Sequence, residues 1–123
     1  MPQTVKWLPK PESHDYQAAE DYLSLIMSPK KAADCRQQLS AAGGDITHRK
    51  AKDILRASQL ALLDSKNKHV ASDLLKVSSG QSLSPILLLR GDDGHPLIVA
   101  DGYHRVCASY WIDENTDIPC VLV

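Results

Sequence analysis

Apolar residues recur at helical spacing in the first third of the chain. One stripe in residues 15–27 (DYQAAEDYLSLIM) consists of Tyr16, Ala19, Leu23 and Ile26. Apolar positions three or four residues apart share one face of an α-helix, and Ser13 and Asp15 are candidate caps for its start. Because such a stripe does not remain solvated, we expect this helix to pack on the rest of the protein or on a second subunit of a homodimer.

A second helix is predicted directly afterwards. Ser28 precedes Pro29, the arrangement of a cap residue followed by proline in the first helical turn. The helix runs through residues 29–42 (PKKAADCRQQLSAA), and Gly43-Gly44 ends it. Before the first helix, residues 1–13 contain three prolines and predict an extended arm. We therefore interpret residues 1–45 as an N-terminal arm with a helical pair.

The rest of the chain mixes strand and helix patterns. Strands are predicted at 46–51, 86–89, 97–100 and 118–123, and helical segments at 52–58, 65–80 and 104–112. Val70, Leu74 and Val77 share one face of the second of these helices. Gly-Asp-Asp-Gly at 91–94 joins two apolar strands and is typical of a hairpin. This order predicts an α+β domain over residues 46–123, with a mixed β-sheet flanked by helices.

Composition and charge exclude some classes of protein. No apolar run reaches the length that spans a bilayer, and the N-terminus lacks the apolar core of a signal peptide, so we expect a cytoplasmic protein without a membrane partner. The net charge of −1 argues against nucleic acid as the main partner. A basic cluster could still touch phosphates non-specifically; it comprises His48, Arg49, Lys50, Lys52 and Arg56. Neither metal-ligand nor disulfide spacing is present among Cys35, Cys107 and Cys120.

The turn between the strand at 97–100 and the helix at 104–112 contains the highest concentration of residues suited to binding an anion. A strand that turns abruptly into a helix leaves backbone N–H groups unpaired, and these attract phosphate or carboxylate. Gly102 permits a tight turn and a close approach, Arg105 can add a bidentate fork, and His104 can donate or exchange a proton. The alternative is structural: Asp101 only caps the helix, while His104 and Arg105 form a solvated first turn.

The segment SPILLLRGDDGHPLIVADGYHRVCASYWIDENTDIPCVLV resembles the core of the ParB-like/sulfiredoxin superfamily, and the similarity extends over residues 46–123. In that family a helix leads to an apolar strand, a hairpin, a Gly-x-x-Arg-like turn with a helix, a polar loop and a final strand. The resemblance implies a nucleotide whose phosphates bind at this turn: ATP in sulfiredoxins, CTP in partition proteins, and ADP or ATP in free-serine kinases, with or without magnesium.

The resemblance also implies individual site residues. The Gly-x-His-Arg signature of sulfiredoxins corresponds to Gly102, Tyr103, His104 and Arg105, so that His104 and Arg105 would contact phosphate. Polar contacts from the preceding helix correspond to His69, Ser72 and Lys76, for which a solvated helix face is the alternative. Tyr103 would stack on a base or ribose, or simply cover the turn.

Three departures narrow what the resemblance implies. Tyr103 stands where sulfiredoxins have their reactive cysteine, so sulfinic acid reduction is not expected, and Cys107 is interpreted as a small buried residue. No helix-turn-helix segment follows the last predicted strand, so the DNA reader of partition proteins is not expected. Nuclease chemistry needs clustered metal ligands, but Asp92, Asp93 and His95 lie in a hairpin loop, and we predict no metal site there.

Three functions remain open from the sequence. The first is a nucleotide-binding domain that transfers a phosphoryl group to a small hydroxyl-bearing molecule, since the serine kinases' Asp-Gly-His-x-Arg turn is similar to Asp101–Arg105. Its general base would be Asp101 or Asp53, with His104 as a second catalytic group. The second is an interaction module gated by nucleotide through the N-terminal helices. The third is a nuclease or DNA-binding accessory protein.

Overall fold

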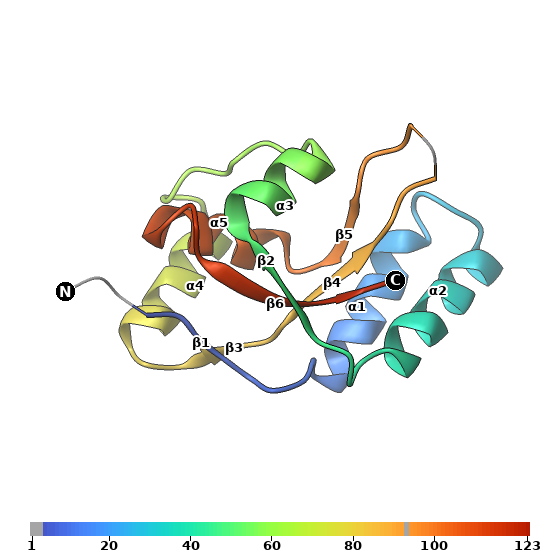
Figure 1. The fold of residues 1–123 in the computed structure, drawn as a ribbon, viewed down its shortest axis with the longest axis horizontal. Coiled ribbons are helices and arrows are strands. Elements are labelled where there is room, and N and C mark those ends of the chain that lie inside the picture. Colours follow the sequence, from blue (N-terminus) through green and yellow to red (C-terminus); the bar gives the residue numbers. More distant parts are fainter. Residues whose placement is uncertain (1–3, 93) are drawn as a thin grey trace.

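The computed structural model describes residues 4–92 and 94–123, which form five helices and six strands (Figure 1). The helices are α1 (Ser13–Leu23), α2 (Pro29–Ala41), α3 (Ala51–Ser58), α4 (Lys68–Ser78) and α5 (Tyr103–Ile112). The strands are β1 (Lys6–Trp7), β2 (Thr47–Lys50), β3 (Ser82–Leu83), β4 (Ile86–Leu89), β5 (Ile98–Asp101) and β6 (Asp117–Leu122). The α+β class expected from the sequence is confirmed.

The main sheet has four strands in the order β2-β6-β4-β5. β4 pairs with β5 antiparallel, which confirms the hairpin, and β4 pairs with β6 parallel. β2 pairs antiparallel with β6 and forms one edge, where all four of its residues are exposed. The sheet is therefore mixed, with its two most apolar strands, β4 and β6, in the centre.

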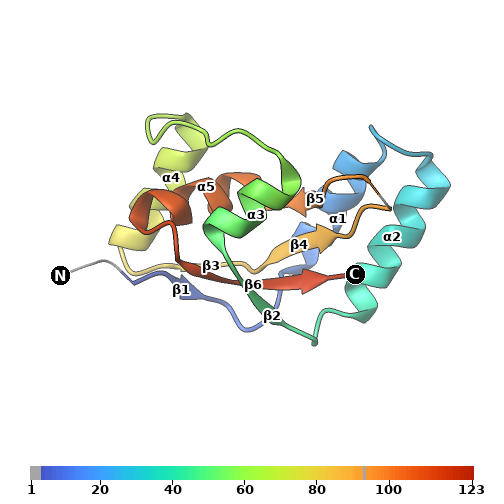
Figure 2. The same cartoon turned by 45° about the horizontal axis from the view of Figure 1, so that its top comes forward.

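Helices cover both faces of this sheet, as Figures 1 and 2 show. Side chains alternate along β4, so Ile86 and Leu88 join the core under α3, α4 and α5, while Leu87 and Leu89 face α1 and α2. On the second face, Ala19, Leu23, Ala32 and Leu39 of the helical pair are completely buried. The prediction that this pair packs on the rest of the protein is confirmed.

The predicted apolar stripe of α1 is wrong at its end. The helix stops at Leu23, four residues earlier than expected, and the Ile26 side chain is 51% exposed in the following turn. The start also differs: Glu12 is the N-cap, and its carboxylate and that of Asp15 form a reciprocal capping box, in place of a cap by Ser13. The second helix begins as predicted, with the Ser28 hydroxyl accepting a hydrogen bond from the Lys31 N–H.

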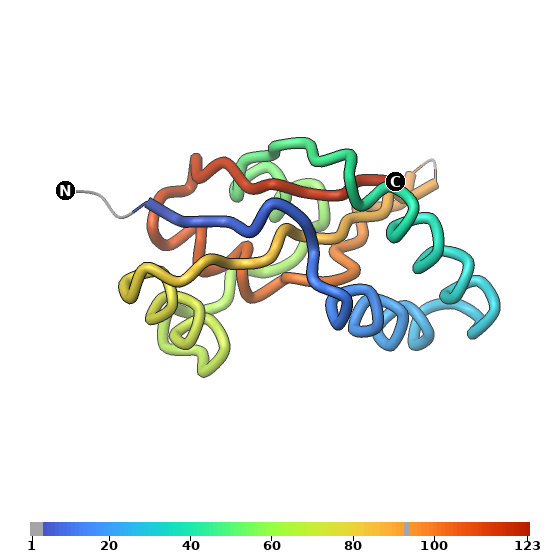
Figure 3. The backbone as a smooth tube through the Cα atoms, turned by 90° about the horizontal axis from the view of Figure 1, so that it is seen from below, coloured from blue at the N-terminus to red at the C-terminus, as the bar shows by residue number. Residues whose placement is uncertain are grey.

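A two-stranded parallel sheet was not predicted. Lys6 and Trp7 of the N-terminal arm pair with Ser82 and Leu83, and Figure 3 shows this arm running beside β3 before it turns into α1. Strands of two residues have no periodicity that a sequence pattern can reveal. This pairing brings the start of α1 close to the end of β5. The turn from β5 into α5, which carries the predicted site residues, lies at that end.

Candidate functional site

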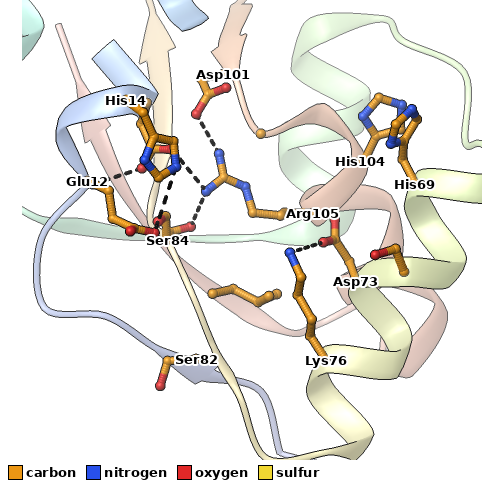
Figure 4. Close-up of a pocket in the computed structure, with 14 residues that line it drawn as sticks. Glu12, His14, His69, Asp73, Lys76, Ser82, Ser84, Asp101, His104 and Arg105 are labelled. Carbon is orange, nitrogen blue, oxygen red and sulfur yellow. Dashed lines mark hydrogen bonds and ion pairs between the residues drawn. The ribbon is translucent and has the colours of Figure 1, made fainter. Parts of the chain in front are cut away.

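A cavity of about 310 Å³ opens at the junction of α1, α4, β3 and the β5–α5 turn (Figure 4). This volume is at the lower end of the range of roughly 300–1,000 Å³ that is typical of small-molecule sites. The lining residues come from four separate parts of the chain: Glu12, His14, Asp15, His69, Ser72, Asp73, Lys76, Ser82, Leu83, Ser84, Asp101, Gly102, His104 and Arg105. Of the site residues predicted from the sequence, all except Tyr103 and the alternative base Asp53 line this cavity.

Gly102 forms the turn that begins α5. Its φ of +107° lies in the left-handed region, which strains any residue with a side chain, and no side chain caps the helix that follows. The first-turn N–H groups of α5 are therefore available to a ligand. However, a Cβ on Gly102 would lie 2.4 Å from Ile86 Cδ1 and 2.9 Å from Arg105 Nη2. The glycine is thus required first by packing against the protein itself.

Arg105 is largely buried, with 13% of its side chain exposed. Its Nη2 donates to Asp101 Oδ2 at 2.6 Å, and its Nη1 donates to the Ser84 backbone carbonyl at 2.9 Å. Nη1 also lies 4.0 Å from Asp15 Oδ1. The solvated first turn that was the structural alternative for Arg105 is therefore wrong. The guanidinium joins β5, the segment before β4 and α1, and keeps further N–H donors beyond these two bonds.

Asp101 is a carboxyl group in a strongly perturbed environment. Burial raises its pKa to about 6, against the opposing effect of the Arg105 guanidinium, and the Asp15 carboxylate beside it raises the pKa further. A carboxyl group with such a pKa can exchange a proton near neutral pH. Asp53, the other candidate base, lies on α3 with its carboxylate 3.3 Å from Arg56, and it does not line this cavity.

Two imidazoles meet on the opposite wall. The rings of His69 on α4 and His104 on α5 have centroids 4.8 Å apart. Burial lowers the pKa of His104, and the neighbouring His69 lowers it further. Both rings lie above Asp73 and Lys76 in Figure 4. The helical spacing of His69, Ser72 and Lys76 therefore does place these side chains at the cavity, together with the turn.

Tyr103 is the one predicted binding residue that does not line the cavity. Its hydroxyl donates to the Ala61 backbone carbonyl, and its ring packs against the core under α3, α4 and α5. In this arrangement Tyr103 joins the turn to the loop after α3 and does not line the cavity. Cys107, one helical turn later, is completely buried, and burial raises the pKa of its thiol, in agreement with a packing role.

Sequence reasoning missed half of the cavity. Asp73 lies four residues after His69 and three before Lys76, so the three side chains share one face of α4. This helical spacing could have identified it. The wall formed by Glu12, His14 and Asp15 gave no such signal, because it lies more than 80 residues from the turn in sequence. Ser84, whose hydroxyl donates to Glu12 Oε1 at 2.7 Å, connects this wall to the segment between β3 and β4.

Glu12, His14 and Asp15 also bring three potential metal-ligand atoms within 4.8 Å of one another. Both carboxylates already cap α1, and the positive end of the helix dipole opposes a cation there. The hairpin loop lies elsewhere: Asp92 and His95 border a different groove, between α2 and β5, and Asp93 is outside the described residues. No helix among residues 4–92 and 94–123 is long and apolar enough to cross a membrane.

Comparison of the chain with models of protein families, with curated proteins and with solved structures finds no match.

Proposed function

We propose that this cavity binds the phosphate groups of a nucleotide, namely ATP, ADP or CTP. One observation carries the proposal: His69, Ser72 and Lys76 on α4 converge with the first turn of α5 on a single cavity. The two segments are about 30 residues apart. The turn was expected to bind an anion because of its own residues, whereas the residues on α4 were expected to do so only from the family resemblance. Convergent donors at a helix N-terminus are the usual form of a phosphate site.

The charged side chains that line the cavity restrict the form in which a nucleotide can bind. The cavity is lined by two fixed cations, Lys76 and Arg105, and three histidines, but also by the carboxylates of Glu12, Asp15, Asp73 and Asp101. Four carboxylates outnumber two cations, so a polyphosphate would be opposed unless charge is neutralised by protons or by a metal ion. Magnesium bound to the nucleotide meets this condition, and it is the form in which we expect the ligand.

We further propose that the bound nucleotide donates a phosphoryl group to a small hydroxyl-bearing molecule. The acceptor oxygen forms a bond to phosphorus while its proton passes to the Asp101 carboxylate. The bond from phosphorus to the bridging oxygen breaks, and the shortened nucleotide leaves with that electron pair. His104 is the second group near the reacting atoms that can exchange a proton. The raised pKa of Asp101 supports its role as the base.

A second candidate is an interaction module gated by nucleotide. It is favoured by one contact, the 4.0 Å separation between Arg105 Nη1 and Asp15 Oδ1. A phosphate that draws Arg105 away would alter the N-terminus of α1 and so the helical pair. The DNA-binding alternative has less support, because the basic cluster lies on the exposed edge strand β2 and on α3, outside the cavity.

Calorimetric titration with ATP, ADP and CTP, with and without magnesium, tests the binding proposal. Lys76→Gln should weaken binding by about tenfold or more, the effect of losing one hydrogen bond to a charged group. Lys68→Gln is the matched control, since Lys68 begins the same helix but does not line the cavity. Absence of binding by the wild type at millimolar nucleotide, or equal losses in the two variants, would overturn the proposal.

Turnover separates the two candidate functions. Wild-type protein incubated with the nucleotide that binds and with a panel of small alcohols should form phosphorylated product and the shortened nucleotide in equal amounts. Asp101→Asn should reduce that rate by at least about a hundredfold, the range for loss of a general base. Binding without product, accompanied by a ligand-dependent change in oligomeric state, would favour the gated module instead.

A further inference from the structure

Asp73 lies among the groups that would receive the phosphates. It projects from α4 between His69 and Lys76, and only 9% of the residue is exposed, although Ser72 and Lys76 beside it are exposed. Figure 4 shows its carboxylate pointing toward the same space as Lys76 and the Arg105 side chain. A buried carboxylate in the middle of a phosphate site is unexpected, because it repels the ligand.

The partners of Asp73 differ from those of the other three carboxylates in the cavity. Glu12 accepts from the Ser84 hydroxyl, Asp15 from the Glu12 N–H, and Asp101 from Arg105. Within residues 4–92 and 94–123, the Asp73 side chain accepts no hydrogen bond; its contact is an ion pair with Lys76 Nζ at 3.8 Å. The remaining charge around it comes from His69 on its own helix and from His104 and Arg105 on α5, which act against the effect of burial on its pKa.

In the free protein, therefore, the cations of the cavity serve as counter-ions for Asp73. A bound polyphosphate competes for the same cations, Lys76 above all, and leaves the carboxylate facing another anion. Two like charges in a partly buried cavity repel more strongly than in water, because the effective dielectric constant is lower. A divalent cation already on the phosphates reduces that repulsion.

We propose that Asp73 is a specificity-determining residue that makes the cavity select the magnesium complex of the nucleotide against the metal-free polyanion. This inference rests on the proposed nucleotide site and assigns to Asp73 a repulsive part in it. Selectivity of this kind arises when a site contains a group that opposes the wrong ligand as well as groups that attract the right one. Asp73 then lowers the affinity for every polyphosphate, but least for the charge-neutralised form.

The experiment compares wild type with Asp73→Asn, which keeps the shape of the side chain and removes its charge. ATP is titrated calorimetrically at pH 8 in excess magnesium and, separately, in EDTA. We expect wild type to bind metal-free ATP about tenfold more weakly than magnesium-ATP, about 1.4 kcal/mol of selectivity. In Asp73→Asn the ratio should narrow to about threefold or less, through tighter binding of metal-free ATP.

Asp34→Asn is the matched control, because Asp34 is an exposed residue of α2 that does not line the cavity, and the same change of charge there should leave the wild-type ratio intact. Asp73→Ser supplies a second neutral variant if the asparagine protein does not fold.

A ratio that narrows through weaker binding of magnesium-ATP would identify Asp73 as a metal ligand and overturn the inference. An unchanged ratio would overturn it as well, with the nucleotide site intact. Failure of wild type and variants to bind nucleotide in either buffer would instead remove the proposed function, and this inference with it.

Discussion

Arg105 Nη2 lies 2.6 Å from Asp101 Oδ2, so the last residue of β5 and the first turn of α5 are joined by a charge-assisted hydrogen bond. Both side chains are largely buried, at 13% and 18% exposed. Both residues line the cavity, and the Ser84 carbonyl and Asp15 lie beside the guanidinium. Arg105 is thus a structural anchor as well as a candidate phosphate contact, and the two roles need separate experiments.

Replacing Arg105 by alanine should destabilise the protein. The change leaves Asp101 and Asp15 without their cation in a buried setting, which typically costs about 3–5 kcal/mol, reduced here because Asp101 can take up a proton. We expect a loss of about 2–4 kcal/mol in the free energy of unfolding, measured by urea denaturation at pH 7. Arg56→Ala, which removes an 85% exposed side chain paired with Asp53, should change it by less than about 0.5 kcal/mol. Similar values for the two variants would show that the buried pair does not anchor the turn.

Stability should fall with rising pH because of Asp101. Burial raises the pKa of its carboxyl in the folded protein from 3.8 to about 6, so the folded state holds the proton more tightly than the unfolded chain. The stabilisation from this proton is fully present below about pH 4 and is lost as the pH rises through 6. Its size is on the order of 3 kcal/mol, from a shift of about two pKa units. Urea denaturation of wild type and Asp101→Asn between pH 3.5 and 7.5 isolates the effect, since other groups titrate in both proteins. Parallel curves across that range would contradict the assignment.

Gly102→Ala should be among the more costly glycine substitutions in this chain. The φ of +107° strains a residue with a side chain, and the new methyl group meets Ile86 Cδ1 and the Arg105 guanidinium. We expect a loss of about 2–4 kcal/mol in the free energy of unfolding. Gly44→Ala is the control, because its Cβ would have no neighbour within 4 Å. Any effect of Gly102→Ala on nucleotide binding has to be compared at a temperature where both proteins are folded. Equal thermal midpoints for the two variants would count against the strained, close-packed turn.

The helical pair should contribute directly to stability. Leu23 is completely buried against the second face of the sheet, and truncation to alanine should cost about 2–5 kcal/mol. Leu25, two residues later, is 81% exposed, and Leu25→Ala should change stability by less than about 0.5 kcal/mol. Deletion of residues 1–42 should expose Leu87, Leu89, Ala100 and Val121 and reduce solubility. A deleted protein with unchanged solubility and melting temperature would show that the sheet does not need this cover.

Much of the fold is readable from local patterns. The continuous apolar run of Ile86–Leu89, the glycine-rich hairpin and the helical spacing of Val70 and Val77 each depend on neighbours a few residues away, and each prediction is confirmed. The end of the first helix at Leu23 is an exception. There an apolar residue continued the helical spacing, but the chain had to turn back so that α2 could cover the sheet.

The residues of the cavity also fall into those that the sequence predicted and those that only the structure revealed. The Gly102–Arg105 turn was predicted because the chemistry of a turn is encoded within a few residues. The donors on α4 were expected only from the family resemblance. The opposite wall, with Glu12 and Asp15, exists because the arm pairs with β3 and carries α1 across the end of β5. Burial of Arg105 and the high pKa of Asp101 follow from that packing. The sequence alone determined which residues could bind an anion. Only the tertiary structure decided which carboxylates would face them, since contacts between segments more than 80 residues apart depend on the packing of the whole core.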